Sequence, residues 1–147
     1  MKGQPVPDSD HVARYCKATT VENGEIQPTA FMMRQTEMYL SVNWLEELKC
    51  PERAAQITEL QKLYATKLKV GATARIAVLN VGTLRVKVER ESPDRRVLPI
   101  LHEPIIPDDP SHAGIYGILY DDREIIAELI AQIVLENHPA QASRPAA

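Results

Sequence analysis

Residues 121–134 read DDREIIAELIAQIV, and this stretch gives the strongest secondary-structure signal in the chain. Its large apolar residues are Ile125, Ile126, Leu129, Ile130, Ile133 and Val134. On an α-helix these positions form one broad apolar stripe. Asp121 and Asp122 precede it in the first turn, where carboxylates interact favourably with the helix dipole. The pattern predicts a helix whose apolar stripe packs against a sheet.

A second helix is expected between Pro51 and Gly71. Proline is well tolerated at the first position of a helix, and glycine is common just beyond its end. The apolar residues between them recur at spacings of three and four: Ile57, Leu60, Tyr64 and Leu68. The remaining positions carry charged side chains, so the pattern predicts an amphipathic helix of roughly four turns.

Strand patterns supply the expected sheet. Residues 38–44 alternate polar and apolar side chains, which predicts a half-buried strand. Residues 75–81 are rich in apolar and β-branched residues, and residues 84–89 alternate apolar and charged side chains. Gly82 between them favours a hairpin. Residues 97–102 contain a proline and are typical of an edge strand. The chain is therefore predicted to be α+β, with an antiparallel sheet of four or five strands packed against two main helices.

Two segments are expected to be irregular. Asp8 or Ser9 is predicted to cap a short helical turn over residues 11–16. Residues 103–117 hold three prolines and two glycines, which argues against a regular helix or a central strand. We place one domain at residues 1–138 and a flexible C-terminal tail at residues 139–147.

Composition indicates a soluble cytoplasmic protein. Hydrophobic residues make up 44% of the chain, yet no apolar run approaches the ~20 residues of a membrane helix. The first residues lack the apolar stretch of a signal peptide. Cys16 and Cys50 are therefore expected to be free thiols in a reducing compartment, with a single disulfide as the alternative.

Basic residues are concentrated in the middle of the chain. Residues 62–96 carry nine basic and three acidic groups, whereas residues 97–147 carry two basic and eight acidic groups. We expect these parts to pack side by side and neutralise each other. Nucleic-acid contact through residues 62–96 is the alternative, although the whole chain has a net charge of −3.

The first candidate site lies in residues 8–16. Asp10 and His11 can supply a metal ligand set or an acid/base pair, with His11 as a general base. Arg14 is a candidate for holding an anionic group, and Cys16 is a nucleophile only if an imidazole lies beside it. The alternative is a capped helix start with surface polar side chains and a buried, inert cysteine.

The second candidate site surrounds His112, which stands close to Gly114 and can act as a general base. Ser111 is a candidate binding residue beside it. In the strand over residues 38–44, Ser41 and Asn43 share one face and can donate hydrogen bonds to an oxyanion or a phosphate. An ordinary polar sheet face and an exposed, idle histidine are the alternatives.

Sequence motifs of several enzyme classes are absent. The chain contains no P-loop motif, GxGxxG, HExxH, GxSxG or EF-hand loop. This absence argues against P-loop nucleotide hydrolysis, Rossmann dinucleotide binding and zincin proteolysis.

Three segments, Asp8–Cys16, Tyr39–Leu45 and Ser111–Gly117, together resemble a group of small bacterial proteins without an assigned function. The resemblance implies a bacterial, cytoplasmic setting and carries no activity to this chain.

Two classes of function follow from these observations. The favoured hypothesis is a non-catalytic interaction protein or accessory subunit with a protein partner, and homo-oligomerisation is a further expectation. The alternative is a small hydrolase-like or metal-dependent enzyme with a His/Asp/Cys site. No cofactor is predicted, and a divalent metal ion at the Asp10–His11 cluster belongs to the enzyme alternative.

Overall fold

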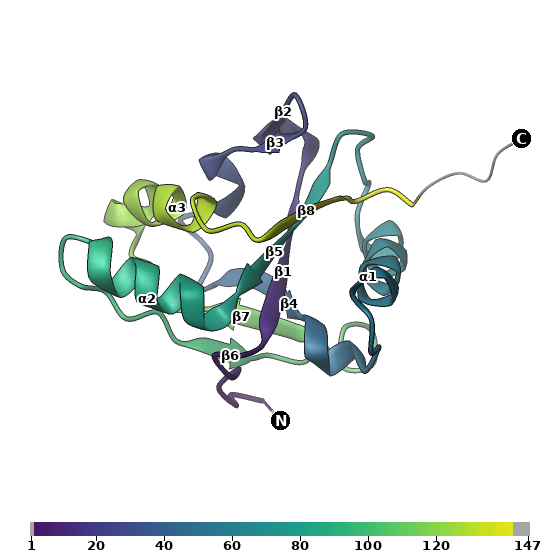
Figure 1. Ribbon diagram of the computed structural model, residues 1–147, viewed down its shortest axis with the longest axis horizontal. Helices are drawn as coiled ribbons and strands as arrows, with labels where there is room; N and C mark the ends of the chain where they lie inside the picture. The colour runs from purple at the N-terminus through teal and green to yellow at the C-terminus, as the bar shows by residue number, and fades with distance from the viewer. Residues whose placement is uncertain (1, 143–147) are drawn as a thin grey trace, which may run out of the picture.

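A six-stranded antiparallel sheet forms the centre of the structure, with the strand order β6-β7-β4-β1-β5-β8 (Figure 1). The computed structural model describes residues 2–142. The strands of the sheet are β1 (His11–Cys16), β4 (Leu40–Trp44), β5 (Arg75–Asn80), β6 (Ile100–His102), β7 (His112–Ile115) and β8 (Glu136–Pro139). A separate two-stranded ribbon consists of β2 (Val21–Glu22) and β3 (Glu25–Ile26).

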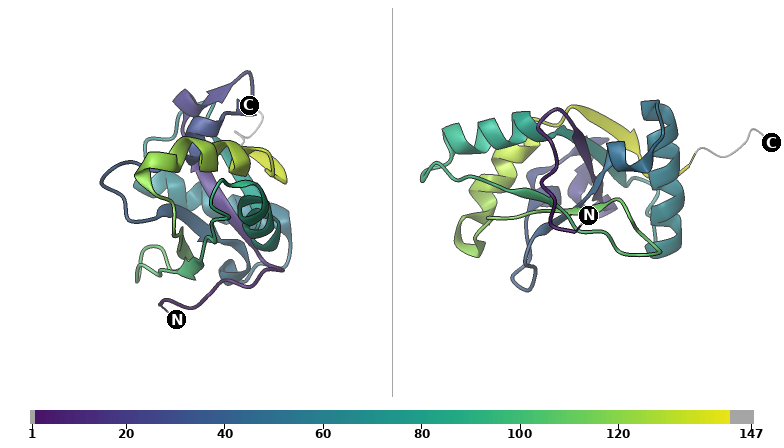
Figure 2. Two further views of the ribbon diagram at one scale, coloured as in Figure 1. Left: turned by 90° about the vertical axis from the view of Figure 1, so that its left-hand side faces the viewer. Right: turned by 90° about the horizontal axis from the view of Figure 1, so that it is seen from below.

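Three α-helices cover the sheet: α1 (Arg53–Lys67), α2 (Val81–Glu91) and α3 (Arg123–Ala131). Four short 3-10 helices complete the fold: η1 (Ala18–Thr20), η2 (Pro28–Phe31), η3 (Leu45–Leu48) and η4 (Tyr120–Asp122). Helices α2 and α3 lie together on one side of the sheet and α1 lies on the other, in the views of Figures 1 and 2. No helix within residues 2–142 has both the length and the apolar character to span a membrane.

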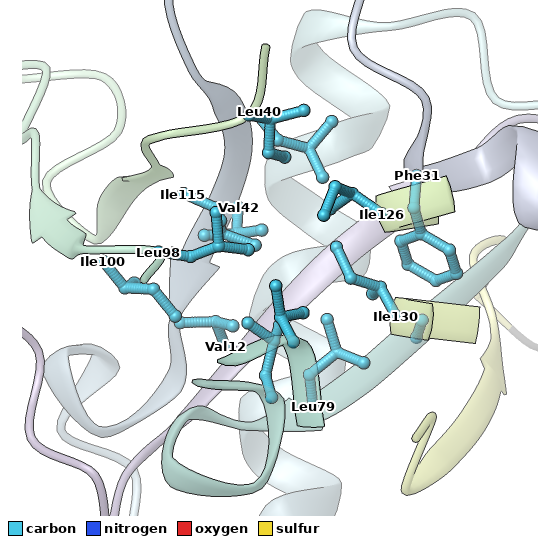
Figure 3. Close-up of a cluster of buried hydrophobic side chains, with 14 of the residues drawn as sticks. Val12, Phe31, Leu40, Val42, Leu79, Leu98, Ile100, Ile115, Ile126 and Ile130 are labelled. Carbon is cyan, nitrogen blue, oxygen red and sulfur yellow. The ribbon is translucent and has the colours of Figure 1, made fainter. Parts of the chain in front are cut away.

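The central strands are apolar on both faces because both faces are covered. Val12 and Leu79 belong to the core under α2 and α3, whereas Ala13 and Val78 belong to the core under α1. Figure 3 shows the larger core, where Ile126 and Ile130 of α3 approach Phe31 of η2 and the sheet. Burial on both sides explains near-continuous apolar runs such as residues 76–79.

The predicted α+β class is confirmed, with six strands in the main sheet in place of the expected four or five and with a third helix. The predicted strands at β4 and β5 and the predicted helices at α1 and α3 are present. The predicted edge strand over residues 97–102 is also present, shortened to β6.

The hairpin predicted over residues 75–89 is wrong, because its second half is helix α2. Asn80 caps this helix, and its Oδ1 accepts a hydrogen bond from Thr83 N at 2.9 Å. The buried residues Val81, Leu84 and Val88 recur with helical spacing, whereas Val86, which completes the strand-like alternation, is exposed. Packing against α3 and the sheet therefore overrides the local β propensity.

The helical turn predicted over residues 11–16 is also wrong, because this segment is the central strand β1. It pairs with β5 along its whole length and with β4 at its start. Asp8 and Asp10 precede the strand, and their backbone carbonyls accept hydrogen bonds from the N–H groups of Gly82 and Val81 at 2.9 and 3.0 Å. Asp8, one of the two expected capping residues, and Asp10 therefore accept from N–H groups in the first turn of α2.

The expectation that residues 103–117 contain no central strand is wrong for β7, which lies between β6 and β4. The three prolines all precede the strand, so they remove none of its ladder donors. Gly114 lies inside β7 because the ring of Tyr39 covers it: a Cβ atom there would lie 2.3 Å from Tyr39 Cδ1.

The ordered sheet extends past the domain end that was predicted at residue 138. Pro139 is part of β8, and Ala140 is buried and donates its N–H to Ala74 O at 3.0 Å. Residues 143–147 of the expected tail lie outside the described residues.

Two isoleucines of α3 test the packing of this helix. Ile130 is fully buried, whereas Ile125 is 44% exposed. We expect Ile130→Ala to lower the free energy of unfolding by roughly 2–5 kcal/mol, because it removes apolar contacts and leaves a cavity. Ile125→Ala should cost much less. Urea unfolding of both variants measures the difference, and equal losses would contradict this packing.

Candidate functional site

The candidate site lies where strands β1 and β4 separate. Their ladder covers only the pairs Val12–Trp44 and Ala13–Asn43. Beyond it the side chain of Arg14 occupies the gap, where Nη1 donates to Ser41 O at 2.8 Å and Nε donates to Ala30 O at 3.0 Å. A guanidinium thus joins β1 to β4 and η2 at the point where backbone pairing ends.

A pocket of about 630 Å³ opens beside this gap. We call it the Arg14 pocket. Its polar lining consists of Arg14, Tyr15, Lys17, Thr19, Thr20, Thr29, Arg34, Glu37, Ser41, Asn43, Tyr64, Lys67 and His112. These residues come from β1, the segment around η1 and η2, β4, the last turns of α1 and β7. The volume is typical of pockets for small molecules.

The lining is strongly cationic. It contains four basic side chains, Arg14, Lys17, Arg34 and Lys67, and one carboxylate, Glu37. Glu37 accepts from the backbone N of Arg34 at 2.7 Å and lies 3.7 Å from its side chain. Much of the positive charge in the pocket therefore has no neutralising carboxylate in its lining.

Arg14 differs from its basic neighbours in burial and in its partners. Burial lowers the pKa of the Arg14 guanidinium below its ordinary value, although its electrostatic interactions with Cys16 and Glu37 oppose this effect. Among residues 2–142 its hydrogen bonds reach only backbone carbonyls, and it forms no ion pair with a carboxylate. Arg14 is half-buried, and a partly desolvated cation without a carboxylate in contact is costly, so a bound anion would relieve that cost.

A hydrogen-bond network centred on Asn43 forms one wall. Asn43 Nδ2 donates to Asp109 Oδ1 at 2.8 Å and to Ser111 Oγ at 2.9 Å, and Asn43 Oδ1 accepts from Tyr64 OH at 2.8 Å. Lys67 Nζ donates to Asp109 Oδ2 at 2.7 Å. Burial, and next the Asp109 charge, raises the pKa of Tyr64, so its hydroxyl keeps the proton that it donates. The network fixes the orientation of Asn43 and Lys67 at the pocket.

His112 occupies the β7 side of the pocket in a defined tautomer. Its Nδ1 lies 2.9 Å from Glu103 O, and a carbonyl can only accept, so Nδ1 carries the hydrogen. The backbone N of Glu103 also donates to His112 O at 2.8 Å. The Tyr39 ring packs at 5.8 Å from the imidazole, centroid to centroid. In the neutral ring, Nε2 is therefore a hydrogen-bond acceptor.

The structure brings together part of the predicted site. Arg14, Ser41, Asn43 and His112 all line the Arg14 pocket, and Ser111 joins them through its hydrogen bond with Asn43. These residues come from β1, β4 and β7 and the residue before β7, although the sequence analysis placed them in separate clusters.

Asp10 and His11 do not line this pocket. His11 Nδ1 lies 2.8 Å from Glu46 Oε2, and Asp10 Oδ2 accepts from Trp44 Nε1 at 2.9 Å. Within residues 2–142, no group of three His, Cys, Asp or Glu side chains is placed to hold a metal ion. The described residues therefore give no support for metal binding by Asp10 and His11.

Cys16 lacks the imidazole contact that a role as a nucleophile requires. It lies in the core with Val12, and its Sγ–H donates to Arg14 O at 3.4 Å, so its contact is a carbonyl and not an imidazole. Burial raises the pKa of the Cys16 thiol to about 12. Both cysteines are free, as expected from the sequence.

Several pocket residues were not identified from the sequence. Tyr64 was interpreted only as part of the apolar stripe of α1 and Lys67 as part of its solvent-exposed face. Their spacing of three places both on one side of the helix, which is the single sequence signal that relates them. No local sequence pattern identifies Lys17 and Arg34 as pocket residues, because their place in the lining depends on how η1 and η2 fold over the sheet.

The segments Asp8–Cys16, Tyr39–Leu45 and Ser111–Gly117 contain β1, β4 and β7, which are neighbours in the sheet order. Comparison with protein-family models, curated proteins and solved structures found no match.

The Asn43 network supports a stability prediction. Asn43→Ala should lower the free energy of unfolding by roughly 3 kcal/mol, because it leaves Tyr64 OH and one oxygen of the buried Asp109 carboxylate without a partner. The exposed Asn137→Ala is the control and should cost about 1 kcal/mol or less. Denaturant unfolding compares them. A loss for Asn43→Ala no larger than for Asn137→Ala would show that the network is not formed.

Alkylation tests the placement of Cys16. Only the thiolate reacts, and with a pKa of about 12 roughly one thiol in ten thousand is ionised at pH 8. Iodoacetamide should therefore modify the half-buried Cys50 in the folded protein and reach Cys16 only in denaturant. Peptide mass spectrometry separates the two sites. Modification of Cys16 as fast as Cys50 in the folded protein would contradict its burial.

Proposed function

We propose that the protein is a binding protein for a small anionic ligand, which it holds in the Arg14 pocket. The observation that carries this proposal is the half-buried Arg14 guanidinium, whose hydrogen bonds within residues 2–142 reach only backbone carbonyls. A guanidinium has five N–H donors, and two of them are used. A phosphate or carboxylate is the natural partner for the others, since its oxygens match the geometry of the guanidinium.

The other polar side chains of the pocket lining also favour the binding of an anion. Lys17, Arg34 and Lys67 raise the positive potential of the pocket. Thr19 and Thr29 add hydroxyl groups, which can donate to anionic oxygens. Lys67 keeps its own carboxylate, Asp109, so it contributes a positioned and partly neutralised cation.

A ligand-binding domain accords with the non-catalytic role that the sequence favours. The expected protein partner and homo-oligomer stay predictions. Catalysis stays the alternative, with His112 as the base and without the Cys16–His112 pair, since the Cys16 thiol contacts the Arg14 carbonyl.

Nucleic-acid contact through residues 62–96 also stays a prediction. Four of the nine basic residues of this stretch lie on the two helices that cover opposite sides of the sheet: Lys62 and Lys67 on α1, Arg85 and Lys87 on α2. These four form ion pairs with carboxylates. The structure therefore offers less support for nucleic acid than for a small anion, because the charge is divided between two sides and part of it is paired.

Titration with inorganic phosphate tests the proposed function. A ligand that binds only the folded state raises its stability, by about 2.7 kcal/mol when its concentration is 100 times Kd. We expect phosphate at low ionic strength to raise the melting temperature of the wild type. Arg14→Met should abolish the rise, because it removes the guanidinium. Arg85→Gln is the matched control, since Arg85 lies on α2 and pairs with Asp8.

A second variant guards against misfolding of Arg14→Met. Arg34→Gln changes a well-exposed side chain of the pocket rim and should weaken phosphate binding while leaving the fold intact. An absence of any phosphate effect on the wild type, or an equal loss in Arg85→Gln, would refute the proposal.

A further inference from the structure

His112 gives the Arg14 pocket a feature that anion binding does not require. Its Nδ1–H is engaged by Glu103 O, which leaves Nε2 as an acceptor in the neutral ring. Within residues 2–142 the structure shows no hydrogen-bond partner for Nε2, and this nitrogen is not among the buried polar atoms that lack one. Nε2 is therefore accessible, and His112 lines the pocket.

Other acceptors of the pocket are hydroxyl groups or already have a partner. Glu37 Oε1 accepts from the backbone N of Arg34, and Asn43 Oδ1 accepts from the Tyr64 hydroxyl. The hydroxyl groups of Thr19, Thr29 and Ser41 can donate as well as accept, whereas Nε2 of the neutral His112 ring can only accept. The basic side chains are donors only. The pocket therefore pairs a donor-rich region at Arg14 with an acceptor at His112.

The sheet sets the separation of these two regions. Arg14 belongs to β1 and His112 to β7, and β4 lies between these strands. Neighbouring strands are about 4.8 Å apart, so the two backbones are separated by roughly 10 Å. The pocket that both residues line has a volume of about 630 Å³, far more than a phosphate ion occupies, so it has room for a phosphate ester with a chain of several carbons.

We infer that the ligand of the Arg14 pocket is an anion that also carries hydroxyl groups, of the size of a sugar phosphate, and that His112 Nε2 accepts a hydrogen bond from one of them. The inference rests on the proposed function, because the Arg14 end must hold the anionic group. His112 is then a specificity-determining residue. It is held by two contacts with the Glu103 backbone and by the Tyr39 ring.

Two ligands of equal carbon number and similar charge test this inference: ribose 5-phosphate and pentyl phosphate. Calorimetry should show that the wild type binds ribose 5-phosphate about tenfold more tightly, as expected for one additional buried hydrogen bond. His112→Phe keeps a flat ring but removes the acceptor. It should abolish this preference while leaving the affinity for pentyl phosphate unchanged. The control is His138→Phe on β8, which should retain the preference.

A nitrogen NMR measurement on the wild type avoids any dependence on the variant folding. The ¹⁵N resonance of His112 Nε2 should move when ribose 5-phosphate is added and stay in place with pentyl phosphate. Equal affinity of the wild type for both ligands, or an equal loss of both in His112→Phe, would overturn the role of His112 while leaving anion binding intact. Failure of both esters and of inorganic phosphate to bind would overturn the proposed function as well.

Discussion

The buried carboxylate of Asp109 is the constraint on which the functional part of the structure depends. It is 1% exposed, and a charge so placed must have partners on both oxygens. Lys67 from α1 satisfies one oxygen and Asn43 from β4 satisfies the other. One carboxylate therefore joins the loop before β7, the central sheet and the last turn of α1. The same contacts orient the side chains of Asn43 and Lys67, which line the Arg14 pocket.

The pocket itself originates in an interruption of the sheet. Strands β1 and β4 pair over two residues and then separate, and the Arg14 side chain bridges them. Complete pairing of the two strands would leave no gap for this guanidinium. The interruption thus places a cation at the base of a pocket, with His112 two strands away. A structure that holds a charge in this way is preorganised for a ligand, because the side chains need no rearrangement.

Part of the fold followed from local patterns, and the errors have physical causes. The helix at α3 was predictable because its apolar residues follow one period over a long stretch, and the strand at β5 was predictable because its short apolar run is rich in β-branched residues. In residues 84–88, the spacing of Leu84 and Val88 fits a helix, and the alternation of Leu84, Val86 and Val88 fits a strand. Only the packing of α2 against α3 decides between helix and strand. β1 and β7 are short, and their pairing comes from strands distant in sequence. Among the predicted site residues, Arg14, Ser41, Asn43 and His112 share the pocket, whereas Asp10, His11 and Cys16 do not line it.

The sequence by itself determined the α+β class, the main helices α1 and α3 and the residue types from which an anion site can be built. Periodicity and side-chain chemistry are local properties, so they can be read from one chain. The tertiary structure alone decided that β1, β4 and β7 are neighbours, that Cys16 faces the core, and that Arg14 has no carboxylate partner within residues 2–142. Those outcomes depend on long-range strand pairing and burial, and neither is encoded in the spacing of adjacent residues.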